Sequence, residues 1–303
     1  MKTFDLVMFR TLGDVLMVTP IVAAIKVKYP DSYIRFHTET VYIELLGENK
    51  DINEIVGYEN ANYPAVYEYL KDKHTDHIAR MAMANQYDTC WHHNPDTFNQ
   101  HMIAWYASRT GLLPEGITDY HIRFNIKEEA RLKAKSLVPY ERYAIVHTTS
   151  RVPSKDWSSS FFDKLVDMFN IPFIQIGSGM DRRVSKTLDL CGKTSMQETL
   201  GVMEKATFFV GVDSGPSYMA ESLNLPSFII LGSTMATPQE SSNRGPFIGP
   251  IGPSVKYFEP SRPSQSCCRP ITCYTHCQLN KPCINDIIPE TVYQSIKETI
   301  HVD

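Results

Sequence analysis

The feature that most constrains the fold is the segment 207–222, in which an apolar run stops abruptly at Asp213-Ser214-Gly215-Pro216 and gives way to a helical pattern. This order predicts a strand, a tight turn and the start of a helix. Gly215 allows the backbone a close approach or a positive φ, and Pro216 suits the first helical turn. Because the amides of that turn are free to bind an anion, the segment favours a ligand that carries phosphate.

A shorter version of the same pattern lies near the N-terminus. The apolar run Phe4–Phe9 leads into Leu12-Gly13-Asp14 and then into a long apolar helical segment. Two strand–turn–helix segments, one in each half, predict two domains that face each other with a site between them. The length of 303 residues suits two domains of roughly 150 residues each.

Strand-like and helix-like runs alternate along both halves, a pattern typical of parallel sheets with crossover helices. The sequence therefore predicts an α/β fold. The expected strands span residues 4–9, 33–38, 54–58, 87–91, 121–126, 143–147, 172–177, 207–213 and 227–232. The expected helices span residues 21–28, 78–84, 159–169, 196–205 and 217–223.

The halves are separated by a predicted helix over 128–135 and by Pro139-Tyr140-Glu141-Arg142. We therefore expect a boundary near residue 142 and domains that span 1–142 and 143–303. Near the end of the second domain, a stretch rich in Pro and Gly leads into a cysteine-rich loop, 264–284. A final helix over 289–300 follows that loop.

The charge balance argues against two classes of partner. Lys and Arg number 30 against 34 Asp and Glu, which gives a formal net charge of -4. Neither half is a basic surface of the kind that nonspecific binding to nucleic acid or anionic membranes needs. No apolar run approaches the roughly 20 residues of a transmembrane helix, and the chain begins with a strand rather than a signal peptide. We expect a cytoplasmic protein, with association with a membrane face as the alternative.

Cysteines gather in one short segment near the C-terminus. In a reducing compartment such clustering favours a metal or plain thiols over disulfides. Four thiolates can form a tetrahedral structural site for zinc or iron. The four candidate ligands are Cys268, Cys273, Cys277 and Cys283. Because their spacing lacks paired Cys-x-x-Cys motifs, free thiols remain the alternative.

Several motifs occur in an order and with a spacing that resemble glycosyltransferase family 9, the bacterial heptosyltransferases, over nearly the whole chain. The motifs are Leu12-Gly13-Asp14-Val15 with Thr19-Pro20, His147-Thr148-Thr149 with Lys155 and Trp157, Cys191-Gly192-Lys193-Thr194-Ser195, Val212-Asp213-Ser214-Gly215-Pro216-Ser217, and Cys283-Ile284-Asn285-Asp286-Ile287-Ile288-Pro289. The resemblance implies a GT-B architecture of two Rossmann-like domains whose parallel sheets face a central cleft. It implies that the acceptor binds mainly the first domain and the nucleotide sugar mainly the second. It also implies that the last helix crosses back to the first domain, and that transfer inverts the anomeric centre without a metal ion.

Asp14 is the candidate general base, because transfer of a sugar to a hydroxyl requires removal of the hydroxyl proton as the bond forms. The resemblance supports this role, and a helix N-cap is the alternative. Gly13 beside it is an acceptor-side candidate. His92 and His93 are further acceptor candidates, although scattered histidines are usually structural or lie at the surface.

The donor candidates begin after the first strand of the second half, where an open α/β sheet binds ligands. Thr148, Thr149 and Ser150 offer hydroxyls to a diphosphate, with turn chemistry as the alternative. Lys155 is the second catalytic candidate, because its ammonium can neutralise the departing nucleotide; a solvated surface charge is the alternative. Arg151 is a rival for the phosphate, since this chain carries three more residues before Lys155 than the tightest family version.

The remaining donor candidates lie in two later turns. Asp213, Ser214 and Gly215 supply helix-start amides and a side chain. Tyr218 stands where the family often has His, which puts the identity of the sugar in doubt. In a loop where the family binds the nucleoside, the candidates are Gly177 and Asp181, the latter as an acceptor from ribose hydroxyls or as an exposed helix-start acid.

Trp157 and His147 are interpreted as packing residues rather than catalysts. The leading interpretation of the whole chain is an inverting glycosyltransferase that moves a heptose from ADP-heptose to a hydroxyl acceptor, with lipopolysaccharide core as the family default. A second interpretation keeps the fold but transfers another sugar to a protein or to a modified nucleobase of DNA. A third is a non-catalytic nucleotide-sugar-binding or assembly protein.

Overall fold

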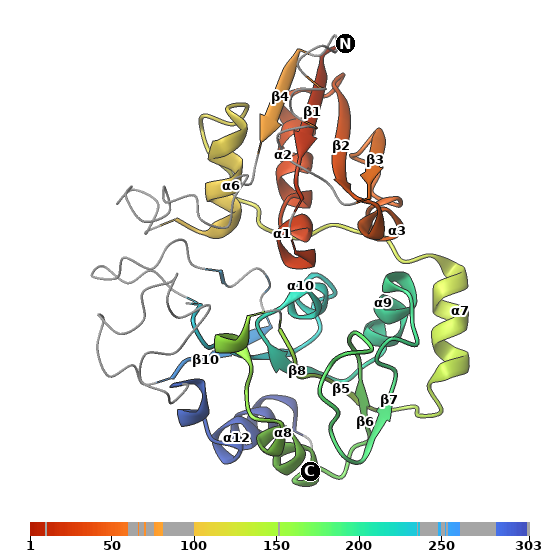
Figure 1. The fold of residues 1–303 in the computed structure, drawn as a ribbon, viewed down its shortest axis with the longest axis vertical. Coiled ribbons are helices and arrows are strands. Elements are labelled where there is room, and N and C mark those ends of the chain that lie inside the picture. Colours follow the sequence, from red (N-terminus) through yellow and green to blue (C-terminus); the bar gives the residue numbers. More distant parts are fainter. Residues whose placement is uncertain are drawn as a thin grey trace. The chain divides into compact units, whose positions relative to one another are not determined.

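The computed structural model describes residues 1–9, 11–59, 66, 70, 76–80, 100–150, 152–234, 236, 248–249, 252, 254–260 and 283–301. By internal packing the chain divides into two compact units, Met1–Asn125 and Ile126–Asp303. Each unit is built on one parallel sheet flanked by helices (Figure 1). The predicted α/β fold with two parallel sheets is therefore confirmed.

The sheet of the first unit has the strand order β3-β2-β1-β4, and all its pairings are parallel. Its strands are β1 (Thr3–Val7), β2 (Tyr33–Glu39), β3 (Glu54–Tyr58) and β4 (His77–Arg80). Its helical segments are α1 (Leu12–Leu16), α2 (Thr19–Lys28), the 3-10 turn η1 (Thr40–Tyr42), α3 (Ile43–Leu46) and α6 (Met102–Thr110). Helix α6 contacts both α2 and β4.

The central strand β1 is buried along nearly its whole length, as expected for a parallel strand with neighbours on both sides. Phe4, Leu6 and Val7 are apolar and buried. Asp5 is the one charged residue of this strand, and its side chain is buried as well. Its Oδ1 lies 2.7 Å from His37 Nε2, so this buried carboxylate has a hydrogen-bonding partner on β2, as buried charges require.

Two predicted elements of the first half are wrong. Residues 78–84 were expected to be helical, but Ile78 and Ala79 lie in β4 and pair with β1. Residues 121–126 were expected to form a strand, yet they have no regular structure. Their backbone is hydrogen-bonded by side chains instead of a neighbouring strand: the Arg123 amide donates to Thr19 Oγ1, and Asn49 Nδ2 donates to the Arg123 carbonyl. The expected strand over 87–91 lies outside the described residues.

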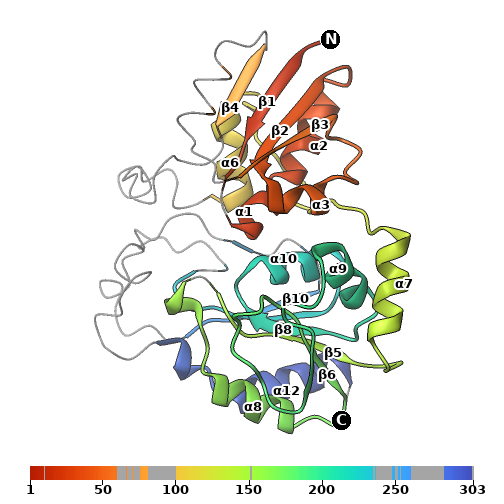
Figure 2. The same ribbon diagram turned by 45° about the vertical axis from the view of Figure 1, so that its right-hand side comes forward.

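The sheet of the second unit has the order β10-β9-β8-β5-β6-β7, again with parallel pairings. Its strands are β5 (Ala144–His147), β6 (Phe173–Gln175), β7 (Thr187–Asp189), β8 (Phe209–Val212), β9 (Ser227–Ile230) and β10 (Val255–Phe258). Its helical segments are α7 (Glu128–Leu137), η3 (Pro153–Lys155), α8 (Ser159–Asp167), α9 (Met196–Glu204), α10 (Gly215–Ser222), η4 (Cys283–Asp286) and α12 (Pro289–Ile300). Helices α8 and α12 cover one face of this sheet, and α9 and α10 cover the other (Figure 2).

Helix α7 packs with the second unit, which therefore begins at Ile126, before the boundary that the sequence suggested near residue 142. Gly201 of α9 allows the close approach, since a Cβ there would lie 2.9 Å from the Ala130 carbonyl oxygen. Arg131 of α7 forms a bidentate pair with Glu204 of α9 at 2.9 and 3.0 Å. These contacts place α7 in the second packing unit.

The last helix α12 spans the predicted residues, and Val292 and Ile296 on its buried face belong to the core of the second unit. Trp157 is fully buried in the same core, and its Nε1 donates to the Ile287 carbonyl at 2.9 Å. The packing role expected for Trp157 is confirmed. The crossing of α12 to the first domain stays a prediction. Among the described residues, no helix combines the length and the apolar character needed to cross a membrane.

Candidate active site

Asp213 lies directly after β8, at the carboxyl end of the second sheet, and is the centre of a buried polar group. It is only 2% exposed. Its Oδ2 accepts from Lys155 Nζ at 2.6 Å and from Thr234 Oγ1 at 2.8 Å. Its Oδ1 accepts from the Tyr218 hydroxyl at 3.0 Å. Both carboxylate oxygens are thus engaged by the protein, and the main effect of Asp213 is to fix the Lys155 ammonium.

Lys155 ends the short helical turn η3, which follows β5. Its side chain is 15% exposed, so it is a paired and largely enclosed cation. Gly232 lies against this turn, since a Cβ there would lie 1.9 Å from the Ser154 carbonyl oxygen and 2.9 Å from Lys155 Cα. Gly232 thus permits close packing against η3, and the ion pair with Asp213, which directly precedes the N-cap Ser214, places the ammonium near the start of α10.

Tyr218 lies one turn into α10 and is 4% exposed. Burial, followed by the negative charge of Asp213, raises the pKa of its phenol well above the ordinary value. The phenol is therefore neutral at physiological pH and can donate to Asp213. In this structure the hydroxyl of Tyr218 is directed at Asp213, which it helps to hold.

Ser214 and Gly215 form the turn between β8 and α10, and the predicted strand–turn–helix is present. Ser214 is the N-cap residue, Gly215 opens the helix and Pro216 lies in its first turn. Gly215 is not among the described glycines with a positive φ. The Ser214 hydroxyl lies 3.0 Å from His147 Nδ1 and 3.1 Å from the Val212 carbonyl oxygen.

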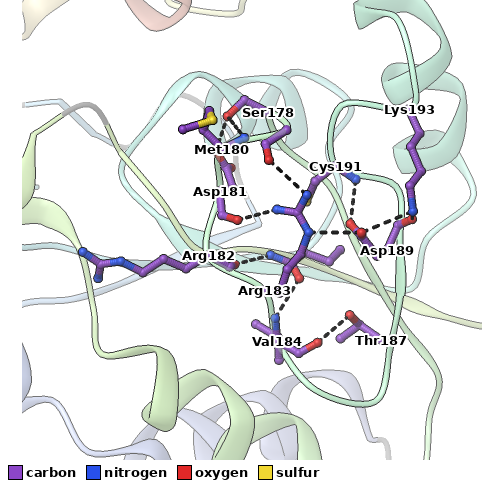
Figure 3. A network of polar contacts seen from close by, with 12 residues as sticks. Ser178, Met180, Asp181, Arg182, Arg183, Val184, Thr187, Asp189, Cys191 and Lys193 are labelled. Carbon is purple, nitrogen blue, oxygen red and sulfur yellow. Dashed lines mark hydrogen bonds and ion pairs between the residues drawn. The ribbon is translucent and has the colours of Figure 1, made fainter.

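The loop after β6 is held by its own polar side chains (Figure 3). Arg183 Nε donates to Asp189 Oδ2 at 3.0 Å, and its terminal nitrogens donate to the carbonyls of Asp181 and Gly179. Lys193 Nζ lies 3.2 Å from the same Asp189 oxygen. Opposing effects act on Asp189: burial raises its pKa, but hydrogen bonds from Cys191, Lys193 and Arg183 lower it to about 2. The loop therefore has a fixed, ionised anchor.

Asp181 faces inward from this loop rather than outward. Its Oδ1 accepts from the Ser178 hydroxyl, and its Oδ2 lies 3.1 Å from His147 Nε2. Burial opposes ionisation of Asp181, but the contacts with His147 and Ser178 outweigh it and hold the pKa below the ordinary value. Gly177 has φ 142°, and a Cβ there would lie 2.0 Å from Asp181 Oδ2. Glycine at 177 therefore makes room for the inward carboxylate.

The hydroxyl-bearing candidates after β5 hold neighbouring backbone in this structure. Thr148 Oγ1 donates to the Arg182 carbonyl at 2.8 Å, and Thr149 Oγ1 accepts from the Arg182 amide at 3.1 Å. The Ser150 amide donates to Asp156 Oδ1 at 2.7 Å. These contacts connect the turn after β5 to the loop after β6. Arg151 lies outside the described residues.

In the first unit, Asp14 belongs to a capping box at the start of α1. Its Oδ2 accepts from Thr11 Oγ1 at 2.8 Å and from the Thr11 amide at 3.3 Å, while Oδ1 accepts from the Tyr106 hydroxyl. Asp14 is half-buried and the neighbouring Gly13 is buried. The N-cap of α1 is Thr11 and not Asp14, which closes the capping box from the third helical position, and Tyr106 of α6 contacts the carboxylate in addition.

The sequence-based predictions missed the contacts of two residues of these sites. Tyr106 is 92 positions from Asp14 in the chain, so no local pattern connects them. His147 was interpreted as a packing residue, yet both its ring nitrogens contact polar side chains. The available clue was its position: His147 is the last residue of the apolar strand β5, at the carboxyl edge of the sheet.

Some candidates cannot be placed. His92 and His93 lie outside the described residues, as do Cys268, Cys273 and Cys277. Cys283 begins η4 and is half-buried. Within the part of the chain that the structure describes, no three His, Cys, Asp or Glu side chains gather in a way that could hold a metal ion.

The family model for glycosyltransferase family 9 (heptosyltransferase) matches residues 91–270, more than half of the chain. This chain belongs to glycosyltransferase family 9. It is 23% identical over 280 residues to lipopolysaccharide heptosyltransferase 3 of Escherichia coli (strain K12), an alignment covering 74% of this chain and 81% of that protein. The resemblance on the sequence motifs is thereby confirmed, and the chain is a heptosyltransferase-like glycosyltransferase.

Solved structures of family 9 share this fold. A glycosyl transferase family 9 protein from Veillonella parvula superposes with a TM-score of 0.75 at 18% identity, covering 99% of this chain and 97% of that one. The dodecameric iron-containing heptosyltransferase TibC, solved in complex with ADP-D-beta-D-heptose, gives 0.69 at 16% identity, covering 98% of this chain and 76% of that one. The GT-B fold class expected from the sequence is confirmed by these neighbours.

Proposed function

We propose that this family 9 glycosyltransferase transfers a heptose from ADP-heptose to a hydroxyl acceptor with inversion at the anomeric carbon. The observation that carries the proposal is the Lys155–Asp213 pair, 2.6 Å apart at the carboxyl end of the second sheet and next to the start of α10. A fixed ammonium beside helix-start amides suits a diphosphate leaving group. TibC in complex with ADP-heptose supports the choice of donor.

In this proposal the second unit binds the donor. Lys155 and the first amides of α10 bear the negative charge that develops on the diphosphate as the bond between it and the sugar breaks. Further donor-site residues, which either contact the donor or hold those that do, are assigned to the turns after β5, β6 and β8. The assigned residues are Thr148, Thr149, Ser150, Arg151, Gly177, Asp181, Asp213, Ser214, Gly215 and Tyr218. For Asp181, Asp213 and Tyr218 we assign an indirect role, since their polar atoms contact the protein.

The first unit binds the acceptor, and Asp14 is the proposed general base. Asp14 accepts the proton of the acceptor hydroxyl while that oxygen forms its bond to the anomeric carbon. The electron pair of the breaking bond leaves on the diphosphate, so inversion needs one displacement. Thr11 and Tyr106 orient the carboxylate. Gly13, His92 and His93 are proposed to lie beside the acceptor.

For the acceptor we propose lipopolysaccharide core, because the curated relative is named a lipopolysaccharide heptosyltransferase. The acceptor hydroxyl then belongs to a sugar of that core. Incubation of the protein with ADP-heptose and truncated core oligosaccharides, followed by mass spectrometry, tests this choice. A mass increase of one heptose is the expected result, and transfer to a protein or to DNA alone would overturn it.

The donor is tested by thermal shift with a panel of nucleotide sugars. A ligand present at 100 times its dissociation constant stabilises the folded state by about 2.7 kcal/mol. We expect ADP-heptose to raise the unfolding temperature and UDP- and GDP-sugars to have little effect. Stabilisation by another nucleotide sugar, with none by ADP-heptose, would overturn the proposed donor.

A structural metal in the cysteine-rich loop remains part of the proposal, because TibC is described as iron-containing. The proposed ligands are Cys268, Cys273, Cys277 and Cys283, with zinc or iron bound. The metal is given no role in sugar transfer. Elemental analysis of protein purified without chelator is expected to find close to one equivalent, and a small fraction of an equivalent would refute the site.

A further inference from the structure

Arg182 and Arg183 are adjacent in the loop after β6, but their guanidinium groups are held very differently. Arg183 directs its nitrogens to Asp189 and to two backbone carbonyls of the loop. Arg182 extends away from this network (Figure 3), and its side chain is 54% exposed. Among the described residues, its one anionic neighbour is Asp156, with Nη2 and Oδ2 3.5 Å apart. This distance is too long for a strong charge-assisted hydrogen bond, so Arg182 is a loosely held cation.

The backbone of Arg182, in contrast, is fixed by three hydrogen bonds with side chains. Its amide donates to Thr149 Oγ1 at 3.1 Å. Its carbonyl accepts from Thr148 Oγ1 at 2.8 Å and from Gln175 Nε2 at 2.6 Å. Gln175 ends β6, Thr148 directly follows β5, and both are buried. The two strands therefore hold Arg182 at the carboxyl edge of the sheet, where open α/β sheets bind ligands.

The same contacts limit what the two threonines can offer to a diphosphate. Each hydroxyl has one hydrogen to donate. The Thr148 hydrogen is directed to the Arg182 carbonyl. Thr149 Oγ1 lies 3.2 Å from Thr148 Oγ1, which is then the acceptor for the Thr149 hydrogen. Because the oxygens of an ionised diphosphate only accept hydrogen bonds, they could bind either hydroxyl only by breaking a contact within the protein. The geometry favours an indirect role in which the threonines position Arg182.

The guanidinium of Arg182 lies beside the turn that carries Lys155. Its neighbour Asp156 follows Lys155 directly, and the other oxygen of Asp156 accepts from the Ser150 amide at 2.7 Å. The contact with Asp156 uses one corner of the guanidinium. Arginine presents five N–H donors in a planar fork that matches the oxygens of a phosphate. Arg182 can therefore keep Asp156 as a neighbour and still direct donors to an anion at this edge of the sheet.

The two cation–carboxylate pairs at this edge differ in strength. Lys155 and Asp213 lie 2.6 Å apart and are mostly enclosed. Arg182 is exposed and lies farther from Asp156, and exposed ion pairs contribute little to stability. A diphosphate can therefore bind the Arg182 guanidinium without breaking a strong internal contact.

We propose that the guanidinium of Arg182 binds the diphosphate of the donor beside Lys155, and that Thr148 and Thr149 act on the donor by positioning Arg182. The inference rests on the proposed function for the location of the donor in the second unit. The charges of the diphosphate are present before the bond to the sugar breaks, so Arg182 contributes mainly to donor affinity. Its loss should raise KM for the donor and leave kcat nearly unchanged.

Calorimetry of ADP and adenosine binding to the full chain tests the contact. ADP carries a diphosphate that adenosine lacks, so a phosphate contact affects the first ligand and not the second. Arg182→Gln is expected to weaken ADP binding by roughly tenfold or more, because charge-assisted hydrogen bonds are lost. Adenosine binding, measured by displacement of ADP, should be unchanged. Arg182→Lys keeps the charge but loses the planar fork, so it is expected to recover part of the affinity.

Two further arginine variants are the controls. Arg142→Gln removes an exposed arginine shortly before β5, at the amino edge of the sheet, and should bind both ligands like the wild type. Arg183→Gln loosens the loop itself and should weaken the binding of both ligands. If Arg182→Gln weakens ADP and adenosine equally, Arg182 acts on the loop and the proposed phosphate contact is overturned.

A double-variant cycle tests the role of the threonines. Thr149→Val removes the acceptor for the Arg182 amide and is expected to weaken ADP binding by roughly threefold in the otherwise unchanged chain. In the Arg182→Gln background it should have no further effect, because the residue that it positions has lost its charge. An equal loss in both backgrounds would show that Thr149 contacts the phosphate itself and would overturn its indirect role.

The remaining outcomes separate this inference from the proposed function. Unchanged affinity of Arg182→Gln for ADP overturns the inference and leaves the proposed function intact, since the nucleotide of the donor is still bound. If the wild type binds another nucleoside diphosphate and not ADP, the proposed donor fails. The same comparison between that nucleotide and its nucleoside then decides the role of Arg182.

Discussion

In both units an aspartate lies near the start of a helix that follows a strand, and a tyrosine donates to it, but the local placement differs: Asp14 is the third residue of α1, whereas Asp213 directly follows β8. In the first unit Tyr106 donates to Asp14, whose other oxygen accepts from Thr11. In the second unit Tyr218 donates to Asp213, whose other oxygen accepts from Lys155. Asp14 is half-buried, whereas Asp213 is 2% exposed.

This difference separates the chemistry that each aspartate can perform. A half-buried carboxylate that accepts from hydroxyl and amide donors keeps some access to solvent, as a base requires. A buried carboxylate paired with an ammonium cannot readily accept a proton from a substrate, because that would leave the ammonium without its counter-charge. The first unit thus presents a carboxylate, and the second presents a cation that a carboxylate holds in place.

The largest expected effect tests the carboxylate of the first unit. Asp14→Asn keeps the size and the contacts to Thr11 but cannot accept a proton, so turnover should fall by roughly 100-fold or more. Initial rates of heptose transfer measure the loss. Asp119→Asn is the control, because Asp119 is an exposed acid of the same unit that pairs with Arg123. Near-normal turnover in a folded Asp14→Asn protein would remove Asp14 from the role of base.

The next effect tests the cation of the second unit. Lys155→Met should reduce kcat by roughly 100-fold, because the diphosphate loses a fixed charge. It should also destabilise the protein by about 3–5 kcal/mol, since the carboxylate of Asp213 stays buried without its cation. Kinetics and urea unfolding measure the two losses separately.

A double variant distinguishes catalysis from structure at this pair. Lys155→Met combined with Asp213→Asn removes both charges, so much of the lost stability should return while turnover stays low. Recovery of turnover along with stability would mean that Lys155 supports the fold and takes no part in transfer. Lys164→Met, which breaks an exposed ion pair with Glu290, should change stability by at most about 1 kcal/mol.

A smaller effect is expected at the tyrosine of the first unit. Tyr106→Phe removes the donor to Asp14 Oδ1 and so loosens the orientation of the carboxylate, so kcat should fall by roughly tenfold with little change in KM. Tyr140→Phe, at an exposed tyrosine, should alter neither kcat nor KM. A fall in stability without any change in kcat would indicate a structural role only.

The sequence correctly predicted elements that short-range patterns determine. It failed where contacts with distant residues determine the secondary structure. The turn between β8 and α10 follows from the break in apolar residues at Asp213 and the helix signals Gly215 and Pro216, and the structure has it. The strand at Ile78 and Ala79 depends on pairing with β1, which no local pattern records. The irregular segment around Arg123 likewise depends on distant side chains.

The same limit applies to the candidate site. Asp14 and Lys155 stand out because each follows a predicted strand. Their partners Tyr106 and Asp213 are 92 and 58 positions away in the chain, so the sequence could not connect them. The dual contact of His147 has the same cause, since its two partners belong to other loops. Site residues could therefore be predicted from their positions at the carboxyl ends of strands. Their hydrogen-bonding partners could not be predicted.

The smallest effect on turnover is expected at the tyrosine of the second unit. Tyr218→Phe removes the donor to Asp213 Oδ1, but Lys155 and Thr234 still hold Oδ2, so the ammonium should keep its place. Turnover should change less than about twofold, while the free energy of unfolding should fall by about 1–2 kcal/mol, since a buried carboxylate oxygen loses its partner. If the two aspartates differ as argued, Tyr106→Phe should instead lose more turnover than stability. A loss of turnover in Tyr218→Phe as large as that in Tyr106→Phe would show that the orientation of Asp213, like that of Asp14, acts on the reaction itself.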